Sequence, residues 1–292
     1  MTKNSPLRIG TRRSKLAMWQ AERVKEIILK VFPNYHCEII PIETTGDLQL
    51  DKPISDIGGK GIFLKEIEQA LVDDRIDIAV HSFKDITAIP NQDLIYSGFI
   101  LEESVTDTFI LFDEKSLTDT LTIGTGSLRR KALCAQLYPS IQCVDIRGNV
   151  HSRIQRAKEV GLDGLMLSTA GLERMNLTSL MTYECNPQEF IPAPGQGMIA
   201  IQQRANESDV HRIVTSITNT STNYLAGLYY DILHAVNFNC GIPFGAYLDS
   251  NNTLNVFIEV KNTPHSFQIK NMSNRKIELL LNKMRALNAF SS

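Results

Sequence analysis

The sequence predicts an α/β protein with two lobes joined by a hinge, followed by a small C-terminal α+β domain. Short apolar runs alternate with amphipathic helical stretches over the first two thirds of the 292 residues, which is typical of parallel βα units. A lone apolar run, Met198–Gln202, follows the second βα series and most simply returns to complete the first sheet. The chain then crosses twice between the lobes. We assign residues 1–99 and 197–217 to the first lobe, 100–196 to the second and 218–292 to the C-terminal domain.

The first lobe begins with a predicted strand at Leu7–Thr11 and a helix from Lys15 to about Phe32, with Ser14 as its N-cap. Pro33 and Asn34 end this helix. Its predicted buried stripe consists of Leu16, Trp19, Val24, Ile27, Ile28 and Val31. The next predicted elements are a strand at Cys37–Ile42, a helix at Phe63–Val72 and a strand at Asp77–Val80.

The second lobe repeats the pattern of a strand followed by a helix. Its predicted strands are Leu121–Thr125, Gln142–Ile146 and Leu165–Leu167, and its helices start at Ser127, Asn149 and Thr169. The C-terminal part has a different pattern, with alternating residues that indicate strands between two helices. We predict helices at Asn223–Val236 and Arg275–Ala289, and strands at Gly245–Leu248, Leu254–Val260 and Ser266–Ile269.

Composition narrows the class of protein. The net charge is −2, from 30 basic and 32 acidic residues, which argues against nucleic-acid binding because such proteins usually carry a net basic face. No run reaches the ~20 apolar residues that cross a membrane, and Met1–Pro6 lacks the apolar core of a signal peptide. The five cysteines are scattered without CxxC pairs, so neither a disulfide framework nor a zinc site is expected. We expect a cytoplasmic protein with reduced thiols.

Basic residues recur where a predicted strand gives way to a helix. Such turns lie at the carboxyl edge of a sheet, where α/β proteins bind ligands and helix N-termini already favour anions. The basic residues at these turns include Arg12, Arg13, Lys84, Arg129, Arg130, Arg147 and Arg153. This repetition predicts one site for a small molecule that bears several carboxylates or phosphates.

Asp85 is the strongest candidate for chemistry in such a basic site. It follows Lys84 at the end of an apolar strand, so its side chain is expected at the carboxyl edge of the sheet. A carboxylate there can accept a hydrogen bond from a substrate N–H and move its proton; the alternative is a surface ion pair worth under ~1 kcal/mol. We interpret His81 as a packing or hydrogen-bonding residue, since no Ser/His/Asp arrangement accompanies it, and no spacing indicates a metal.

Two loops have open interpretations. Gly58–Gly61 is either a plain flexible connection or a mobile loop that carries Lys60 over the site. Cys240, in a predicted loop of the C-terminal domain, is either an ordinary buried thiol or a nucleophile and attachment point.

Taken together, the motifs of residues 7 to 204 resemble those of the porphobilinogen deaminase (hydroxymethylbilane synthase) family. The matching segments are Thr11–Ser14, Thr45–Asp47, Gly58–Gly61, Val80–Asp85, Gly124–Arg130, Arg147–Asn149, Ala170–Arg174 and Pro194–Gly197. The resemblance implies two periplasmic-binding-protein-like lobes and a transferase of tetrapyrrole and heme biosynthesis. Such a transferase condenses four porphobilinogen molecules head to tail, with loss of ammonia, into hydroxymethylbilane.

The resemblance also implies a cofactor and a set of site residues. The cofactor is a dipyrromethane, covalently attached through Cys240, and Asp85 is the catalytic residue. The implied cofactor-binding residues are Lys84, Ser127, Arg129, Arg130, Arg147, Arg153 and Arg174, and the implied substrate-binding residues are Arg12, Ser14, Lys60, Phe63 and Gln196. Guanidinium groups suit the acetate and propionate groups of pyrroles because they pair with carboxylates bidentately. No metal, nucleic-acid or membrane partner is implied, and the family forms are mostly monomers.

The chain departs from the family pattern in two places that matter for function. Tyr229–Asp231 and Phe238–Asn239 replace the residues usual before the cofactor cysteine, and Ser104–Asp107 replaces the usual Asp-Pro-Arg-Asp. The main rival to the enzyme is therefore a non-catalytic or degenerate two-lobed protein that binds a polycarboxylate. Such a binder needs the arginines but has no use for Asp85 or Cys240.

Overall fold

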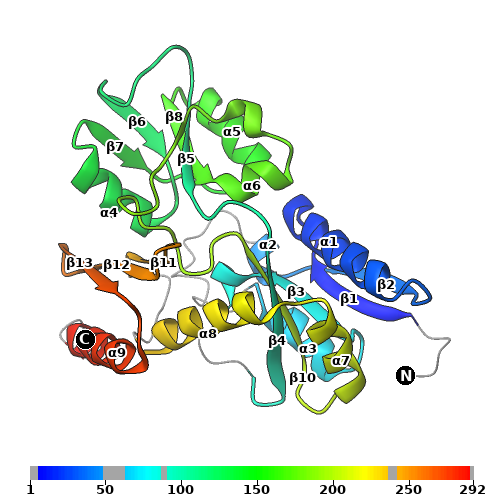
Figure 1. The fold of residues 1–292 in the computed structure, drawn as a ribbon. Helices are drawn as coiled ribbons and strands as arrows, with labels where there is room; N and C mark the ends of the chain where they lie inside the picture. The colour runs from blue at the N-terminus through cyan, green and yellow to red at the C-terminus, as the bar shows by residue number, and fades with distance from the viewer. Residues whose placement is uncertain (1–5, 49–62, 87–90, 236–241, 290–292) are drawn as a thin grey trace. The chain divides into compact units, whose positions relative to one another are not determined.

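A computed structural model describes residues 6–48, 63–86, 91–235 and 242–289 of the chain. It contains two compact units, one formed by residues 1–102 and 198–230 and the other by residues 103–197 and 231–292. Each unit holds a five-stranded sheet, and the second also holds a sheet of three strands (Figure 1). The α/β class, with two sheet-based lobes and a small C-terminal sheet, is as predicted.

The first unit is built on a sheet of order β2-β1-β3-β10-β4. The strands are β1 (Leu7–Arg12), β2 (Cys37–Ile42), β3 (Ile78–Ser82), β4 (Leu94–Leu101) and β10 (Met198–Arg204). β1 runs parallel to β2 and β3, whereas β10 lies antiparallel between β3 and β4. The late strand β10 therefore completes the first sheet, as the lone apolar run predicted.

Helices cover both faces of this sheet. α1 (Lys15–Val31) and α7 (Ser208–Ser216) pack on one face through Val24, Ile28 and Ile213, and α3 (Lys65–Val72) packs on the other through Ile67 and Leu71. The unit also contains the short helices α2 (Thr45–Leu48) and η2 (Phe83–Asp85). The long helix α8 (Thr220–Ala235) belongs to this unit as far as Tyr230, and its last residues belong to the second unit.

The buried stripe of α1 differs in part from the prediction. Its fully buried residues include Ala17, Gln20 and Ala21 beside Val24 and Ile28, whereas Val31 is 45% exposed. Alanines let a helix lie close to a sheet, and Val31 lies in the last turn, where the helix ends. The prediction was based on apolar character alone, so it chose the larger apolar side chains for the buried stripe.

The second unit repeats this plan with the order β7-β6-β8-β5-β9. Its strands are β5 (Asp107–Leu111), β6 (Leu121–Gly124), β7 (Ile141–Val144), β8 (Gly164–Ser168) and β9 (Tyr183–Glu184). The parallel strands β6, β7 and β8 are joined by helices, and β5 lies antiparallel to β8. α4 (Leu128–Leu137) covers one face, and α5 (Val150–Glu159) and α6 (Thr169–Arg174) cover the other (Figure 1). A short helix, η3 (Thr178–Leu180), precedes β9.

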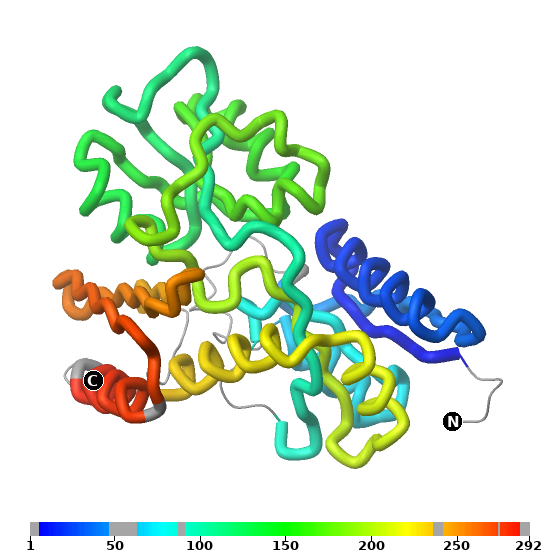
Figure 2. The backbone as a smooth tube through the Cα atoms, in the orientation of Figure 1, coloured from blue at the N-terminus to red at the C-terminus, as the bar shows by residue number. Residues whose placement is uncertain are grey.

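The C-terminal sheet is antiparallel, with β12 (Thr253–Val260) between β11 (Phe244–Leu248) and β13 (Thr263–Lys270). Figure 2 shows this sheet in orange and the helix α9 (Asn274–Ala289) in red. Phe257 of β12 lies in the same core as Phe109 and Phe190, and Ala246 donates its N–H to the Pro192 carbonyl at 3.0 Å. The C-terminal sheet thus shares its core with the second unit. Within the described residues, no helix combines the length and apolar character needed to span a bilayer.

Candidate active site

A small pocket of the first unit gathers four of the predicted site residues. Arg12, Ser14, Phe63 and Asp85 line it, together with residues of α1 and β3. Arg12 ends β1, Ser14 precedes α1, and Asp85 lies in the short helix η2 that follows β3. The carboxyl ends of two adjacent parallel strands therefore supply a cation, a hydroxyl and a carboxylate to one pocket.

The helix that follows β1 begins with a capped turn. The Ser14 hydroxyl accepts a hydrogen bond from the Ala17 N–H at 3.3 Å, so Ser14 is both the predicted N-cap and a pocket residue. The guanidinium carbon of Arg12 lies 3.9 Å from the centre of the Phe63 ring. A cation over an aromatic face is attracted by the ring's quadrupole, so Phe63 helps to hold Arg12 in place.

Two polar residues of this pocket were not predicted. Gln20 of α1 is buried and exchanges hydrogen bonds of 3.0 and 3.1 Å with the Ser82 hydroxyl at the end of β3. Both residues line the pocket. The sequence signal for Gln20 was a glutamine on the apolar face of a predicted helix. A buried amide needs a hydrogen-bonding partner, so such a residue indicates a polar contact inside the protein.

His81 has the packing and hydrogen-bonding role that the sequence predicted. Its Nε2 lies 3.1 Å from Oε1 of Gln202, whose amide donates to Glu68 at 2.8 Å. Burial lowers the pKa of His81 to about 4, although the Gln202 hydrogen bond and the Asp85 charge oppose this shift. His81 is therefore neutral at pH 7. Burial raises the pKa of Glu68, because it disfavours the charged form of a carboxylate just as it disfavours the charged form of an imidazole.

In the second unit, Arg129 and Arg130 converge on one buried carboxylate. Asp107 has no exposed surface, and its two oxygens accept from Nη1 of Arg129 at 2.6 Å and from Nε of Arg130 at 2.8 Å. The Gln196 amide also donates to Asp107, at 3.1 Å. Burial alone would raise the pKa of Asp107, but the two guanidinium charges hold it well below its usual range. Any ligand carboxylate at these arginines would share them with Asp107.

Asp107 was not predicted as a site residue. The sequence signal was a charged residue at the start of a short strand that ends in three apolar residues, Asp107–Leu111. Ser104 and Thr106, which belong to the departure from the family pattern, form a hydroxyl network instead. The Ser104 and Thr106 hydroxyls lie 2.8 Å apart, and Ser104 donates to Glu184 at 3.1 Å.

The remaining predicted residues of the second unit lie in three places. Ser127 caps α4 through the Arg130 N–H at 3.4 Å. Arg147 is half-buried after β7, and Arg153 of α5 donates to the Gly148 carbonyl at 2.6 Å. Arg174 is buried and pairs with Glu103 at 2.6 Å.

The turns that carry Ser127 and Arg147 adjoin each other. A Cβ on Gly126 would lie 3.2 Å from the Ile146 carbonyl oxygen, so the two loops approach closely at the carboxyl ends of β6 and β7. Gly148 has φ = +113°, a conformation that favours glycine. A hydroxyl and a guanidinium are thus brought to the same edge of the second sheet.

Of the other three predicted residues, Lys60 and Cys240 lie outside the described residues, so their predicted roles remain predictions. Lys84 is described and is half-buried in η2, next to Asp85. Among the described residues, no group of three or more His, Cys, Asp or Glu side chains is placed to hold a metal ion.

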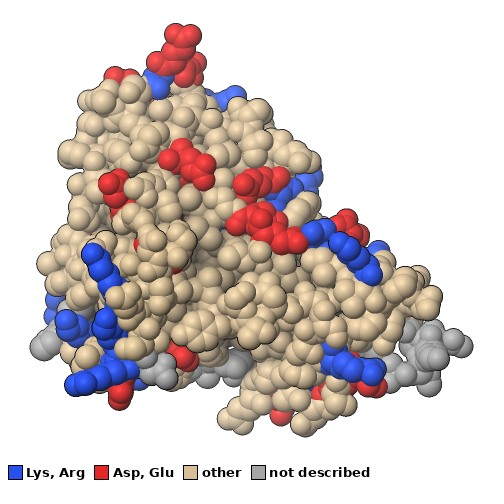
Figure 3. All heavy atoms as spheres, viewed as in Figure 1, with Lys and Arg blue, Asp and Glu red and all other residues tan. Residues whose placement is uncertain are grey.

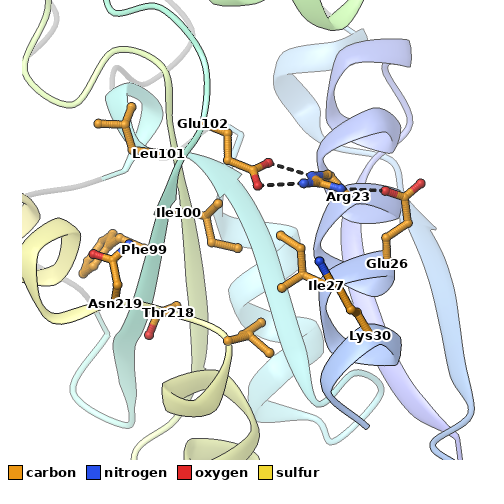
Figure 4. Close-up of a pocket in the computed structure, with 11 residues that line it drawn as sticks. Arg23, Glu26, Ile27, Lys30, Phe99, Ile100, Leu101, Glu102, Thr218 and Asn219 are labelled. Atoms are coloured by element: carbon orange, nitrogen blue, oxygen red, sulfur yellow. Dashed lines mark hydrogen bonds and ion pairs between the residues drawn. The ribbon is translucent and has the colours of Figure 1, made fainter. Parts of the chain in front are cut away.

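A larger pocket of about 420 Å³ in the first unit is a weaker candidate for a polyanion site. Figure 4 shows that Arg23 faces Glu102 and Glu26 there, with Nε of Arg23 2.6 Å from Glu102. Lys30 is the second cation among the described residues of the lining, so two acids balance two bases there. Figure 3 shows the same mixture of basic and acidic groups over α1. This pocket therefore has no excess positive charge for carboxylates.

Comparison with known proteins identifies similar sequences over most of the chain. The family description "Porphobilinogen deaminase, dipyromethane cofactor binding domain" matches residues 7–212. A porphobilinogen deaminase from Rickettsia bellii is 40% identical over 245 residues, which cover 82% of each chain. One from Syntrophomonas wolfei is 41% identical over 241 residues, covering 81% of this chain and 78% of the relative. One from Rickettsia prowazekii is 37% identical over 261 residues, covering 87% and 86%.

Proposed function

Because the chain belongs to the porphobilinogen deaminase family, we propose that it is the transferase that condenses four porphobilinogen molecules head to tail into hydroxymethylbilane. Each condensation breaks the C–N bond of an aminomethyl group, releases ammonia and forms a C–C bond to a pyrrole carbon that loses its proton. Water finally breaks the bond that joins the four added units to the primer, and its hydroxyl becomes the hydroxymethyl group of the product. The observation that carries the proposal is the pocket in which Asp85 lies with Arg12 and Ser14. A non-catalytic binder would not need a carboxylate in a site for carboxylates.

The chemistry of this pocket fits both porphobilinogen and a dipyrromethane. Arg12 and Ser14 supply donors for acetate and propionate groups. Among the described residues that line the pocket, Asp85 is the one carboxylate, and it can accept a hydrogen bond from a pyrrole N–H. As ammonia leaves, positive charge develops on the pyrrole ring, and a fixed carboxylate beside the ring stabilises that charge. Asp85 is therefore our proposed catalytic residue.

The cofactor fits the family description, which names a dipyrromethane-binding domain. When bound, a dipyrromethane supplies the terminal pyrrole carbon to which the first porphobilinogen adds. We assign its attachment to Cys240. The cofactor-binding donors that we propose are the half-buried Lys84 in the first unit and the half-buried Ser127, Arg147 and Arg153 in the second. The other predicted cofactor-binding residues, Arg129, Arg130 and Arg174, are buried and already pair with Asp107 or Glu103, so we propose that they contribute positive charge. Lys60, Phe63 and Gln196 complete the proposed substrate-binding set.

We further propose that the enzyme is a cytoplasmic monomer. Two features of the described residues support this: Cys37, Cys134, Cys143 and Cys185 are free thiols, and the exposed large apolar side chains are scattered over several elements. Gel filtration at several protein concentrations tests the oligomeric state.

Mass spectrometry and turnover together test the proposed function. The intact purified protein should exceed its 32.7 kDa chain by one dipyrromethane, and it should consume porphobilinogen. Cys240→Ser should remove both the added mass and the turnover. Asp85→Asn should abolish turnover and leave the circular dichroism spectrum unchanged. A wild-type protein that consumes no porphobilinogen would reject the enzyme and favour the binder.

A further inference from the structure

Gly46, in the motif Thr45–Asp47, lies directly against the ring of Phe63. A Cβ built on Gly46 would lie 2.2 Å from Cε1 and 2.4 Å from Cδ1 of that ring, far inside van der Waals contact. The backbone of Gly46 does not have a positive φ. Glycine is therefore required at this position by space and not by backbone conformation, because any side chain would displace the ring.

A second contact joins the same two segments. The Thr45 N–H donates to Oε1 of Glu66 at 3.0 Å, and the Thr45 hydroxyl donates to the same oxygen. Glu66 lies in the first turn of α3, three residues after Phe63. Residues 45 and 46 thus hold residues 63 and 66, and this contact between α2 and the start of α3 fixes the Phe63 ring.

The held ring lies beneath the guanidinium of Arg12. The distance from Cζ of Arg12 to the ring centre is 3.9 Å, within the range of a cation–π contact. Arg12 and Phe63 both line the pocket that contains Asp85. A displaced ring would therefore change the position of an arginine of that pocket.

We propose that Gly46 is a positioning residue for carboxylate recognition: its missing side chain lets Phe63 lie where it holds Arg12 toward the pocket. The nature of the bound carboxylate, that of a pyrrole substrate, rests on the proposed function. Arginine position affects binding of the carboxylate in the ground state and the transition state alike, so its loss raises KM more than it lowers kcat.

The matched control is Gly227→Ala, because a Cβ on Gly227 in α8 meets no atom of the described residues within 4 Å. Gly46→Ala should raise KM for porphobilinogen about tenfold, with kcat within about twofold. Gly227→Ala should leave both constants unchanged. The double variant Gly46→Ala/Phe63→Leu should have the KM of Phe63→Leu alone, since without the ring the added methyl has nothing to displace.

A spectroscopic measurement tests the contact without any turnover. With 4-fluorophenylalanine incorporated, the ¹⁹F resonance that disappears in Phe63→Leu belongs to Phe63. This resonance should move in Gly46→Ala and in Arg12→Gln, and should stay in Gly227→Ala. If Gly46→Ala moves neither the resonance nor KM, or if KM of the double variant is the product of the single effects, Gly46 does not position Arg12. A wild-type protein without turnover would reject the proposed function. The ¹⁹F resonance of Phe63 would still show whether Gly46 determines the position of the ring.

Discussion

Replacing Asp107 by asparagine should destabilise the second unit more than any surface charge change. Asp107 has no exposed surface and pairs with both Arg129 and Arg130, which are 5% and 7% exposed. Asp107→Asn keeps the size of the side chain but leaves two buried guanidinium groups without a counter-charge. Breaking a buried pair in this way costs about 3–5 kcal/mol. Because two cations lose their partner, we expect a loss near the upper end of that range.

Urea unfolding followed by far-UV circular dichroism measures this loss. With a slope of about 1–3 kcal/mol per molar urea, a cost of ~4 kcal/mol lowers the midpoint by more than about 1 M. Asp145→Asn is the control, because Asp145 pairs with Lys131 at 2.9 Å but its side chain is 66% exposed. A pair of that kind contributes under about 1 kcal/mol.

The same prediction has a pH dependence with a definite sign. The two arginines hold the pKa of Asp107 below its usual range in the folded state. Its stabilising contribution is therefore complete above the unfolded pKa of about 4 and is lost as the pH falls toward the folded pKa. The difference in stability between wild type and Asp107→Asn should be constant above about pH 5 and should narrow below about pH 4. A cost equal to that of Asp145→Asn, or a difference independent of pH in acid, would refute the reasoning.

Three further predictions concern single residues. The pKa of His81 is about 4 in the folded protein, below its value in the unfolded chain. The free energy of unfolding should therefore fall by up to about 3 kcal/mol as the pH drops from ~6.5 to ~4. In His81→Gln, the fall over the same pH range should be smaller. Gly164→Ala should cost more than about 2 kcal/mol in urea unfolding, because its Cβ would lie 2.4 Å from the Ile110 carbonyl oxygen, while Gly161→Ala, with open space but φ = +70°, should cost only ~1 kcal/mol. Ser14→Ala should lower thermal stability by about 1 kcal/mol, and Ser14→Gly by only a few tenths, since glycine is a tolerated N-cap.

Local pattern was enough to predict most elements of the fold. Strand residues such as Leu7–Arg12 and helix residues such as Lys15–Val31 carry their own periodicity and capping signals. The return of Met198–Arg204 to the first sheet also followed, because a single strand has to pair with an existing edge. The helix Ser208–Ser216 was not predicted, although Val210, Ile213 and Val214 show helical spacing.

The candidate site was predictable only where its residues follow strands directly. Arg12, Ser14 and Asp85 each lie within a few residues of a strand end, so the sheet geometry brings them together whatever the rest of the chain does. Gln20 and Asp107 are defined by the partners that they meet across the unit, Ser82 and two arginines. Such partners are tertiary contacts, and no local spacing encodes them.

The two Tyr residues that depart from the family pattern have a structural explanation in the first unit. The Tyr229 ring lies 6.4 Å from the Phe83 ring, and the Tyr230 ring lies 6.1 Å from the Tyr96 ring, both with edge-to-face geometry. Pairs of this geometry contribute about 0.5–1.5 kcal/mol beyond the area they bury. Phe83 directly precedes Lys84 and Asp85 in η2. Tyr229 therefore supports the short helix that carries the proposed catalytic residue, and Tyr230 packs on β4, so the presence of both tyrosines is compatible with activity.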